Sequence, residues 1–201
     1  MSTRLRGAAR AYKADPDRLM TADDLLYRNP LPDARTELVE GRLLVRELAH
    51  LRHGDVTARL VYAMALHLES DRLSRGAPSP RGLLACNGVG FILRRRPDTV
   101  RAPDIAYLLE ERLPSDVYCY PEMAPDLAVD VLSHADSAEY MTLKLEHWRT
   151  AGCRYAWVVD PQRRSFVAHD NGTVTTFAAG ETFDGNALFP GLQLDIGALF
   201  D

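Results

Sequence analysis

With 201 residues, of which 46% are hydrophobic and 26% charged, the chain suits one globular domain and leaves little room for a second. The formal net charge of -4 disfavours a protein that binds nucleic acid through its overall charge, since such proteins are usually basic. No apolar run approaches the roughly 20 residues of a membrane helix, and no apolar segment follows the basic N-terminus as it would in a secretory signal. Three scattered cysteines without a CxxC pair form neither a disulfide framework nor a structural zinc site. We therefore expect a cytoplasmic protein.

Periodicity and turn residues predict the elements of one domain over residues 19–201. Residues 1–18 are charged and rich in alanine, so we expect a flexible tail there. In chain order the predicted elements are a helix at 21–28, a hairpin at 37–47, a long amphipathic helix at 53–73, a hairpin at 83–93, a strand at 102–109, a strand at 126–133, a helix at 137–151, a strand at 154–160, a hairpin at 165–169 and 173–177, and a strand at 192–196. This order predicts an α/β (α+β) fold with a mixed central sheet flanked by helices.

Two short motifs support the predicted start of the first helix and the second hairpin. Thr21 and Asp24 have the spacing of a capping box, which predicts the start of the first helix. Asn87-Gly88 is a strong two-residue turn signal, so we expect the strands on either side of it to pair as a hairpin.

Asp130 stands inside the most apolar predicted strand, between Val129 and Val131. A lone ionised carboxylate in a dry core costs several kcal/mol, so such a group normally pairs with a cation or binds a metal ion. From the residues alone two interpretations stay open: a buried ion pair with an arginine such as Arg149 or Arg154, or a metal ligand.

Asp104 follows Ala102-Pro103 and opens a second apolar strand that could lie beside the first. Two carboxylates that converge from adjacent strands repel each other unless a cation lies between them. Mg²⁺ suits such a site, because it prefers oxygen ligands and retains several waters. The alternative is an aspartate that caps a turn after proline.

Lys144 lies 14 residues after Asp130, in the helix predicted at 137–151. Its helical neighbours Met141, Leu145 and Trp148 place it at the edge of the core-facing stripe or on it. Either it has a functional partner inside the protein, or it extends its amine to solvent from a partly buried stem.

Five ordered motifs resemble the Uma family of restriction endonuclease-like proteins. They are E-L-V-E-G-R-L at 37–43, His53 ahead of the long helix, A-P-D-I-A at 102–106, D-L-A-V-D-V-L-S at 126–133 and K-L-E-H-W-R-T-A-G-C-R-Y-A-W-V-V-D-P at 144–161. The resemblance covers roughly residues 20 to 197, nearly the whole chain.

The resemblance implies a PD-(D/E)XK nuclease fold and assigns roles to four residues. Asp104 matches the aspartate of the first half-motif, Asp130 the acidic residue of the second, and Lys144 the lysine, here on the following helix. Glu37 matches an N-terminal glutamate that helps to hold the metal. The implied activity is Mg²⁺- or Mn²⁺-dependent hydrolysis of DNA by a homodimer, with Asp104, Asp130 and Glu37 as metal ligands.

Four arginines, Arg94, Arg95, Arg96 and Arg101, cluster just before Asp104. They are candidates for contacts with the phosphate backbone of DNA, and a solvated charged loop is the alternative. His53 is interpreted as a residue that starts a helix or packs against it.

Two departures from the family pattern keep a second function open. Asp130 stands where the family usually has glutamate, and Leu132 occupies the usual place of the lysine. The alternative is therefore a catalytically degenerate member of the same fold that acts as a binding or interaction module.

Overall fold

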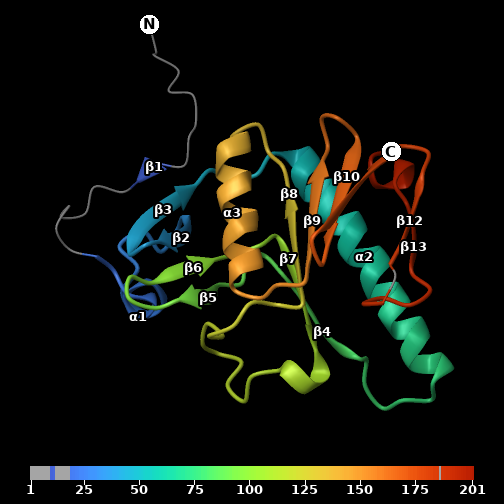
Figure 1. Ribbon diagram of the computed structural model, residues 1–201, viewed down its shortest axis with the longest axis horizontal. Helices are drawn as coiled ribbons and strands as arrows, with labels where there is room; N and C mark the ends of the chain where they lie inside the picture. Colours follow the sequence, from blue (N-terminus) through green and yellow to red (C-terminus); the bar gives the residue numbers. More distant parts are fainter. Residues whose placement is uncertain (1–9, 12–18, 186) are drawn as a thin grey trace, which may run out of the picture.

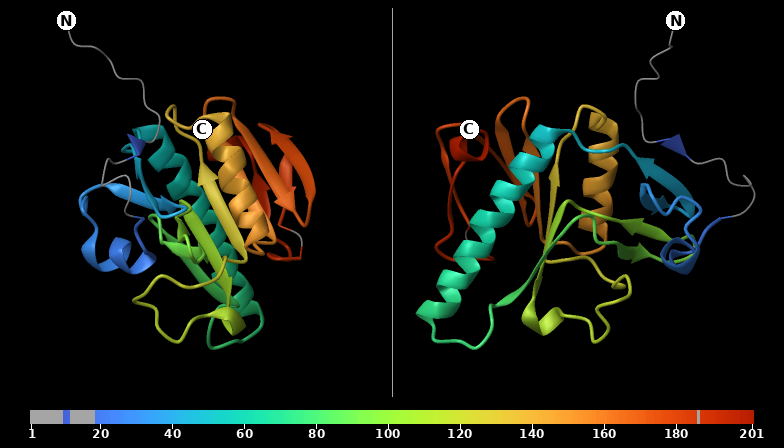
Figure 2. Two further views of the ribbon diagram at one scale, coloured as in Figure 1. Left: turned by 60° about the vertical axis from the view of Figure 1, so that its left-hand side comes forward. Right: turned by 180° about the vertical axis from the view of Figure 1, so that it is seen from behind.

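A computed structural model describes residues 10–11, 19–185 and 187–201 of the chain (Figure 1). Helix α2 lies behind a six-stranded sheet and helix α3 in front of it, while a smaller five-stranded sheet and α1 stand to one side (Figures 1 and 2). The helices are α1 (Ala22–Arg28), α2 (Leu51–Ser74) and α3 (Ala138–Thr150), with short 3-10 turns η1 (Glu110–Arg112) and η2 (Gly197–Leu199). None of these described helices has the length and apolarity needed to cross a membrane.

The six-stranded sheet is mixed. Its order across the sheet is β11 (Thr173–Ala178), β10 (Ser165–Asp170), β9 (Tyr155–Asp160), β8 (Leu127–Val131), β7 (Ile105–Leu109) and β4 (Gly82–Cys86). Strands β8 and β9 are parallel and are joined through α3, while the other neighbours are antiparallel. A parallel pair needs such a crossover, and both of its faces are usually covered.

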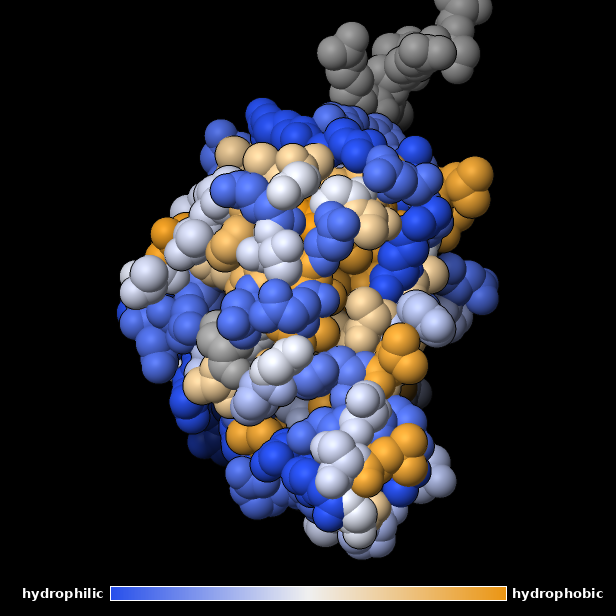
Figure 3. Space-filling model, turned by 90° about the vertical axis from the view of Figure 1, so that its right-hand side faces the viewer, coloured by the Kyte–Doolittle hydropathy of each residue, from blue (hydrophilic) through white to orange (hydrophobic). Residues whose placement is uncertain are grey.

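The smaller sheet has the order β1 (Arg10–Ala11), β3 (Arg42–Arg46), β2 (Arg35–Val39), β6 (Thr99–Arg101) and β5 (Phe91–Arg94). A two-stranded sheet, β12 (Thr182–Asp184) and β13 (Gln193–Asp195), follows near the C-terminus. Figure 3 shows the face that carries this C-terminal region, where hydrophobic side chains form separate patches among hydrophilic ones. Phe183 and Leu194 of this region lie in the main core.

Alternation along the central strands decides which side chains face which helix. Ile105 and Val129 pack in the main core together with the apolar residues of α2. Ala106, the residue after Ile105, and Ala128, the residue before Val129, pack with Trp148 of α3. Because successive residues of a strand point to opposite faces, even-numbered residues of β7 and β8 point toward α3. Polar residues of that parity therefore lie beneath α3.

Most predicted elements are confirmed within one or two residues. Thr21 caps α1 through the predicted capping box with Asp24, and the hairpin turn at Glu40-Gly41 has positive φ at both residues. The mixed sheet between helices is confirmed as well. Of the predicted tail, the structure describes Arg10 and Ala11, which pair with β3, and the rest lies outside the described residues.

The predicted hairpin around Asn87-Gly88 is wrong. Both residues have positive φ, as the turn signal requires, yet β4 before them and β5 after them belong to different sheets. The turn carries the chain from one sheet to the other, and Asn87 N donates to Asp104 O at 3.1 Å. Strand β6, within the predicted basic loop, was also missed, as was β12.

Candidate active site

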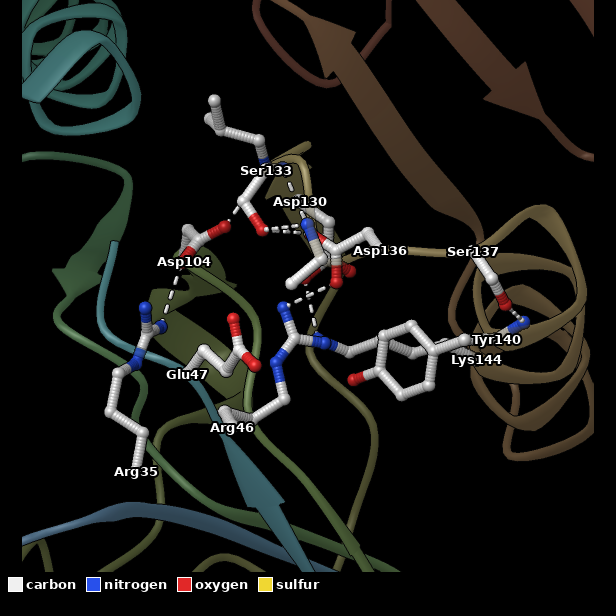
Figure 4. Close-up of polar contacts among 12 residues, drawn as sticks. Arg35, Arg46, Glu47, Asp104, Asp130, Ser133, Asp136, Ser137, Tyr140 and Lys144 are labelled. Atoms are coloured by element: carbon white, nitrogen blue, oxygen red, sulfur yellow. Dashed lines mark hydrogen bonds and ion pairs between the residues drawn. The ribbon is translucent and has the colours of Figure 1, made fainter. Parts of the chain in front are cut away.

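Asp104, Asp130, Lys144 and Glu37 come together beneath α3, where the two larger sheets meet; Figure 4 shows the first three with their neighbours. Ile105 of β7 pairs with Val129 of β8, and continuing this antiparallel register by one residue places Asp104 opposite Asp130. Directly opposite side chains start from Cβ atoms about 4.5–5.5 Å apart. Both carboxyl groups are buried, at 4% and 5% exposure.

Lys144 reaches this acidic pair from α3 and is itself only 1% exposed. Its Nζ lies 2.5 Å from Asp130 Oδ1, 3.2 Å from Glu37 Oε1 and 2.9 Å from the carbonyl oxygen of Ala102. The interpretation of Lys144 as a surface lysine with a solvated amine is therefore wrong. The partner of Asp130 is this lysine, whereas Arg149 is exposed on α3 and pairs with Glu146.

Glu37 of β2 is the most heavily hydrogen-bonded acid of the group. Its Oε2 accepts from Arg101 Nη1 at 2.8 Å and from the Tyr140 hydroxyl at 2.9 Å. Its Oε1 accepts from Ala102 N at 3.0 Å and also faces Lys144. Because both oxygens are engaged, Glu37 holds Lys144 and the β6–β7 connection in place, and its role as a metal ligand stays a prediction.

Asp104 is held by three elements. Its Oδ2 accepts from Val131 N at 2.9 Å and lies 3.2 Å from His53 Nε2 of α2. Its Oδ1 accepts from Arg35 Nη2 at 2.8 Å. Asp104 is thus an anchor between strands and α2 rather than a turn cap, and the buried His53 contacts the site directly.

The pKa values of the three acids in the cluster are shifted in different directions. Burial alone would raise the pKa of Glu37, yet Lys144 and Arg101 hold that pKa well below its usual range. Asp104 is also buried, but His53, Lys144 and Arg35 lower its pKa. Burial raises the pKa of Asp130, and the attraction of Lys144 does not fully offset this effect and the repulsion of Asp104. Asp130 is therefore the acid whose negative charge is least compensated.

The site opens into a pocket of about 390 Å³ that we call the site pocket, lined among others by Arg35, Glu37, Arg46, Asp104 and Lys144. Its walls come from β2 with the segment before it, the end of β3, the turn after β4, the segment before β7, and α3, so residues far apart in sequence share one cavity. Its lining is largely polar and charged. Such a cavity suits a small charged ligand or one segment of a polyanion more than an apolar molecule.

The oxygen ligands of Asp104 and Asp130 are of the kind that a hard divalent cation prefers. Within the described ranges, no three His, Cys, Asp or Glu side chains are grouped closely enough to hold a metal ion by themselves. Asp104 and Asp130 nevertheless present two opposed carboxylates, and the hydrogen bonds described for Asp130 engage Oδ1 alone. Two carboxylates completed by water and a backbone carbonyl match the preference of Mg²⁺. Asp104 and Asp130 would hold such an ion.

The four predicted DNA-contacting arginines do not stay together. Arg101 is fully buried against Glu37 and His147, so its assignment as a residue facing DNA is wrong. Arg94 pairs with Glu40, and Arg95 pairs with Asp98 and Glu122. Arg96 is exposed at the same turn. These three surround the β5–β6 turn and do not line the site pocket, and their contact with DNA stays a prediction.

Sequence reasoning missed three residues of the site: Arg35, Arg46 and Tyr140. Arg35 is the first residue of β2 and Arg46 is the last residue of β3. A charged residue at the end of a strand is common, so neither arginine stands out in the sequence. Tyr140 lies four residues before Lys144, so the two side chains share one face of α3. That spacing was the one available signal.

This fold and its buried acid–lysine cluster define a restriction endonuclease-like protein. Residues 23–197 match the family Uma2, described as "Putative restriction endonuclease". The chain therefore belongs to the Uma2 family.

The fold is also that of a solved structure. It is similar to the crystal structure of "a putative nuclease belonging to DUF820" from Anabaena variabilis, with a TM-score of 0.74 and 18% sequence identity. The similarity covers 90% of this chain and 97% of that one. No protein among the curated ones gives a match.

Proposed function

We propose that this protein is a Mg²⁺- or Mn²⁺-dependent endonuclease that hydrolyses phosphodiester bonds in DNA. The observation that carries the proposal is the convergence of Asp104 and Asp130 on one side of the sheet with Lys144 Nζ 2.5 Å from Asp130 Oδ1. Membership of a nuclease-like family supports the same chemistry. A homodimer would allow both strands of a duplex to be cut, and it stays an expectation by analogy.

Each residue of the cluster has its own role in the proposed reaction. Asp104 and Asp130 would hold the divalent ion, which when bound supplies Lewis-acid stabilisation of the phosphate and a water of lowered pKa. Lys144 is protonated, because Asp130 and Glu37 raise its pKa despite burial. Its ammonium therefore supplies a fixed positive charge beside the reacting phosphate. Glu37 positions this ammonium through the contact at 3.2 Å.

The first test combines thermal unfolding with a plasmid-nicking assay, on wild type and Asp130→Asn in EDTA, Mg²⁺ and Mn²⁺. An ion at 100 times its Kd stabilises the folded state by about 2.7 kcal/mol, which raises Tm by about 5–11 °C for a chain of this size. We expect this rise and metal-dependent nicking in the wild type, and neither in Asp130→Asn.

Asp116→Asn is the matched control, because Asp116 is an exposed loop residue outside the site pocket. It should behave as the wild type does. If the wild type shows no metal-dependent rise and no nicking, the proposal fails, and the metal-free binding module becomes the better description.

One feature of the site favours that alternative, namely that Arg35 already neutralises Asp104 Oδ1. The Arg35 guanidinium would therefore compete with a metal ion for this oxygen. We therefore expect Arg35→Gln to tighten Mn²⁺ binding about fivefold, since a partly exposed ion pair contributes about 1 kcal/mol. Isothermal titration calorimetry with Mn²⁺ measures the change.

Arg35→Lys keeps the charge and should bind Mn²⁺ as the wild type does. Weaker binding by Arg35→Gln would mean that Arg35 orders Asp104 for the ion instead of competing with it.

A further inference from the structure

Arg46, at the end of β3, is held on two sides. Its Nη2 lies 2.8 Å from Asp136 Oδ1, and its guanidinium carbon lies 4.5 Å from the centre of the Tyr140 ring (Figure 4). Asp136 is fixed in turn, because its Oδ2 accepts from Ser133 N at 2.8 Å and from Ser133 Oγ at 3.0 Å. Stacking on an aromatic ring and a fixed carboxylate together define the plane of a guanidinium.

One nitrogen of this guanidinium, Nη1, is buried and makes no hydrogen bond. Nη1 of Arg46 is one of four buried side-chain polar atoms in the described part of the chain that make no hydrogen bond. The other three belong to Arg101, Tyr107 and Trp148, none of which lines the site pocket, whereas Arg46 does. A buried donor without an acceptor is unfavourable, so a charged one beside a cavity favours an acceptor from a ligand.

Charge indicates what that acceptor is. Around the site four acids and four bases form five ion pairs, namely Glu37, Asp104, Asp130 and Asp136 with Arg35, Arg46, Arg101 and Lys144. The charges of these eight side chains cancel. A divalent ion between Asp104 and Asp130 would leave two positive charges, and an anion next to it would restore balance. A phosphate oxygen is both an anion and a strong acceptor for a guanidinium.

We infer that Arg46 binds a phosphate of the nucleic-acid backbone in the site pocket, through Nη1, beside the acidic pair. The inference rests on the proposed function for the nature of the ligand and adds the residue that receives it. The contact is made to a phosphate and not to a base, so it positions the strand without reading its sequence. Arg46 and Lys144 then flank one phosphate from β3 and α3.

The test is binding of a fluorescein-labelled duplex DNA, measured by anisotropy in Ca²⁺ at several salt concentrations. Arg46→Gln should raise Kd about tenfold and lower the slope of log Kd against log salt by about one, as expected for the loss of one phosphate contact. Arg46→Lys should recover part of the affinity, because it keeps the charge but not the planar fork. Arg149→Gln, which removes an exposed charge on α3, should leave Kd and slope unchanged.

Thermal unfolding of Arg46→Gln in EDTA and in Mn²⁺ shows whether the fold and the metal site remain. We expect the rise of Tm in Mn²⁺ to equal that of the wild type. Unchanged DNA affinity and salt slope in Arg46→Gln would overturn the inference, and so would a wild type that binds no DNA. A wild type that binds DNA without cleaving it would refute the nuclease proposal alone, and Arg46→Gln would still decide the role of Arg46.

Discussion

Replacing Lys144 with methionine should destabilise the protein by about 3–5 kcal/mol, the range expected when one partner of a buried ion pair is removed. Methionine fills a similar volume, so the loss comes from charge and not from a cavity. Glu37 keeps Arg101 and Tyr140 as partners, whereas Asp130 loses Lys144, the cation that lies within hydrogen-bond distance of it among the described residues. Urea unfolding at pH 7, with the midpoint and slope fitted separately, measures the change.

A second substitution shows where the cost arises. In Lys144→Met/Asp130→Asn the unpaired charge is gone, so part of the lost stability should return and the two changes should not add. If Lys144→Met alone costs less than about 1 kcal/mol, the ammonium contributes little to folding. Lys144 would then be retained for chemistry alone, with Asp130 protonated in the folded protein.

Three residues of the buried cluster could be singled out from the sequence because each is anomalous where it stands. Asp130 interrupts an apolar strand, Asp104 begins another, and Lys144 shares a stripe with Trp148. Alternation and the 3.6-residue period are local properties, so they indicate which faces these side chains take. That the three converge required the resemblance to a family, since pairing of β7 with β8 is a long-range contact.

The sequence-based predictions were wrong about which strands pair and about which side chain Arg101 contacts. Asn87-Gly88 specifies a local backbone turn correctly, and nothing local specifies whether the strands beside it pair with each other. Arg101 belongs to a run of basic residues that looks exposed as a group. It lies on β6 next to β2, so its side chain is buried against Glu37, 64 positions earlier in the chain.

Acid should remove the stability that these pairs provide. The pKa values of Glu37 and Asp104 are lowered in the folded protein, from ordinary values of 4.5 and 3.8. Their contribution is fully present above those unfolded values and is lost as pH falls toward the folded ones. Asp130 has a raised pKa and acts in the opposite sense, favouring the folded state as pH falls through the folded pKa toward 3.8. The effect of Asp130 ends near 3.8, where the carboxyl is protonated in both states, whereas Glu37 and Asp104 continue to titrate below that value. Stability should therefore fall steeply below about pH 4.

Glu37→Gln isolates one of these groups, because it keeps the shape of the side chain and removes its titration. The variant should be less stable than the wild type at pH 7, since Lys144 and Arg101 lose a shared counter-charge. Its stability should also depend less on pH between 4.5 and 3, by up to about 1.4 kcal/mol for each pH unit. Surface carboxylates titrate alike in both proteins and cancel in the comparison. Urea unfolding from pH 3 to pH 7 gives both curves, and parallel acid limbs would mean that folding does not lower the pKa of Glu37. Of its two acidic partners, Asp130 alone would then neutralise the ammonium of Lys144.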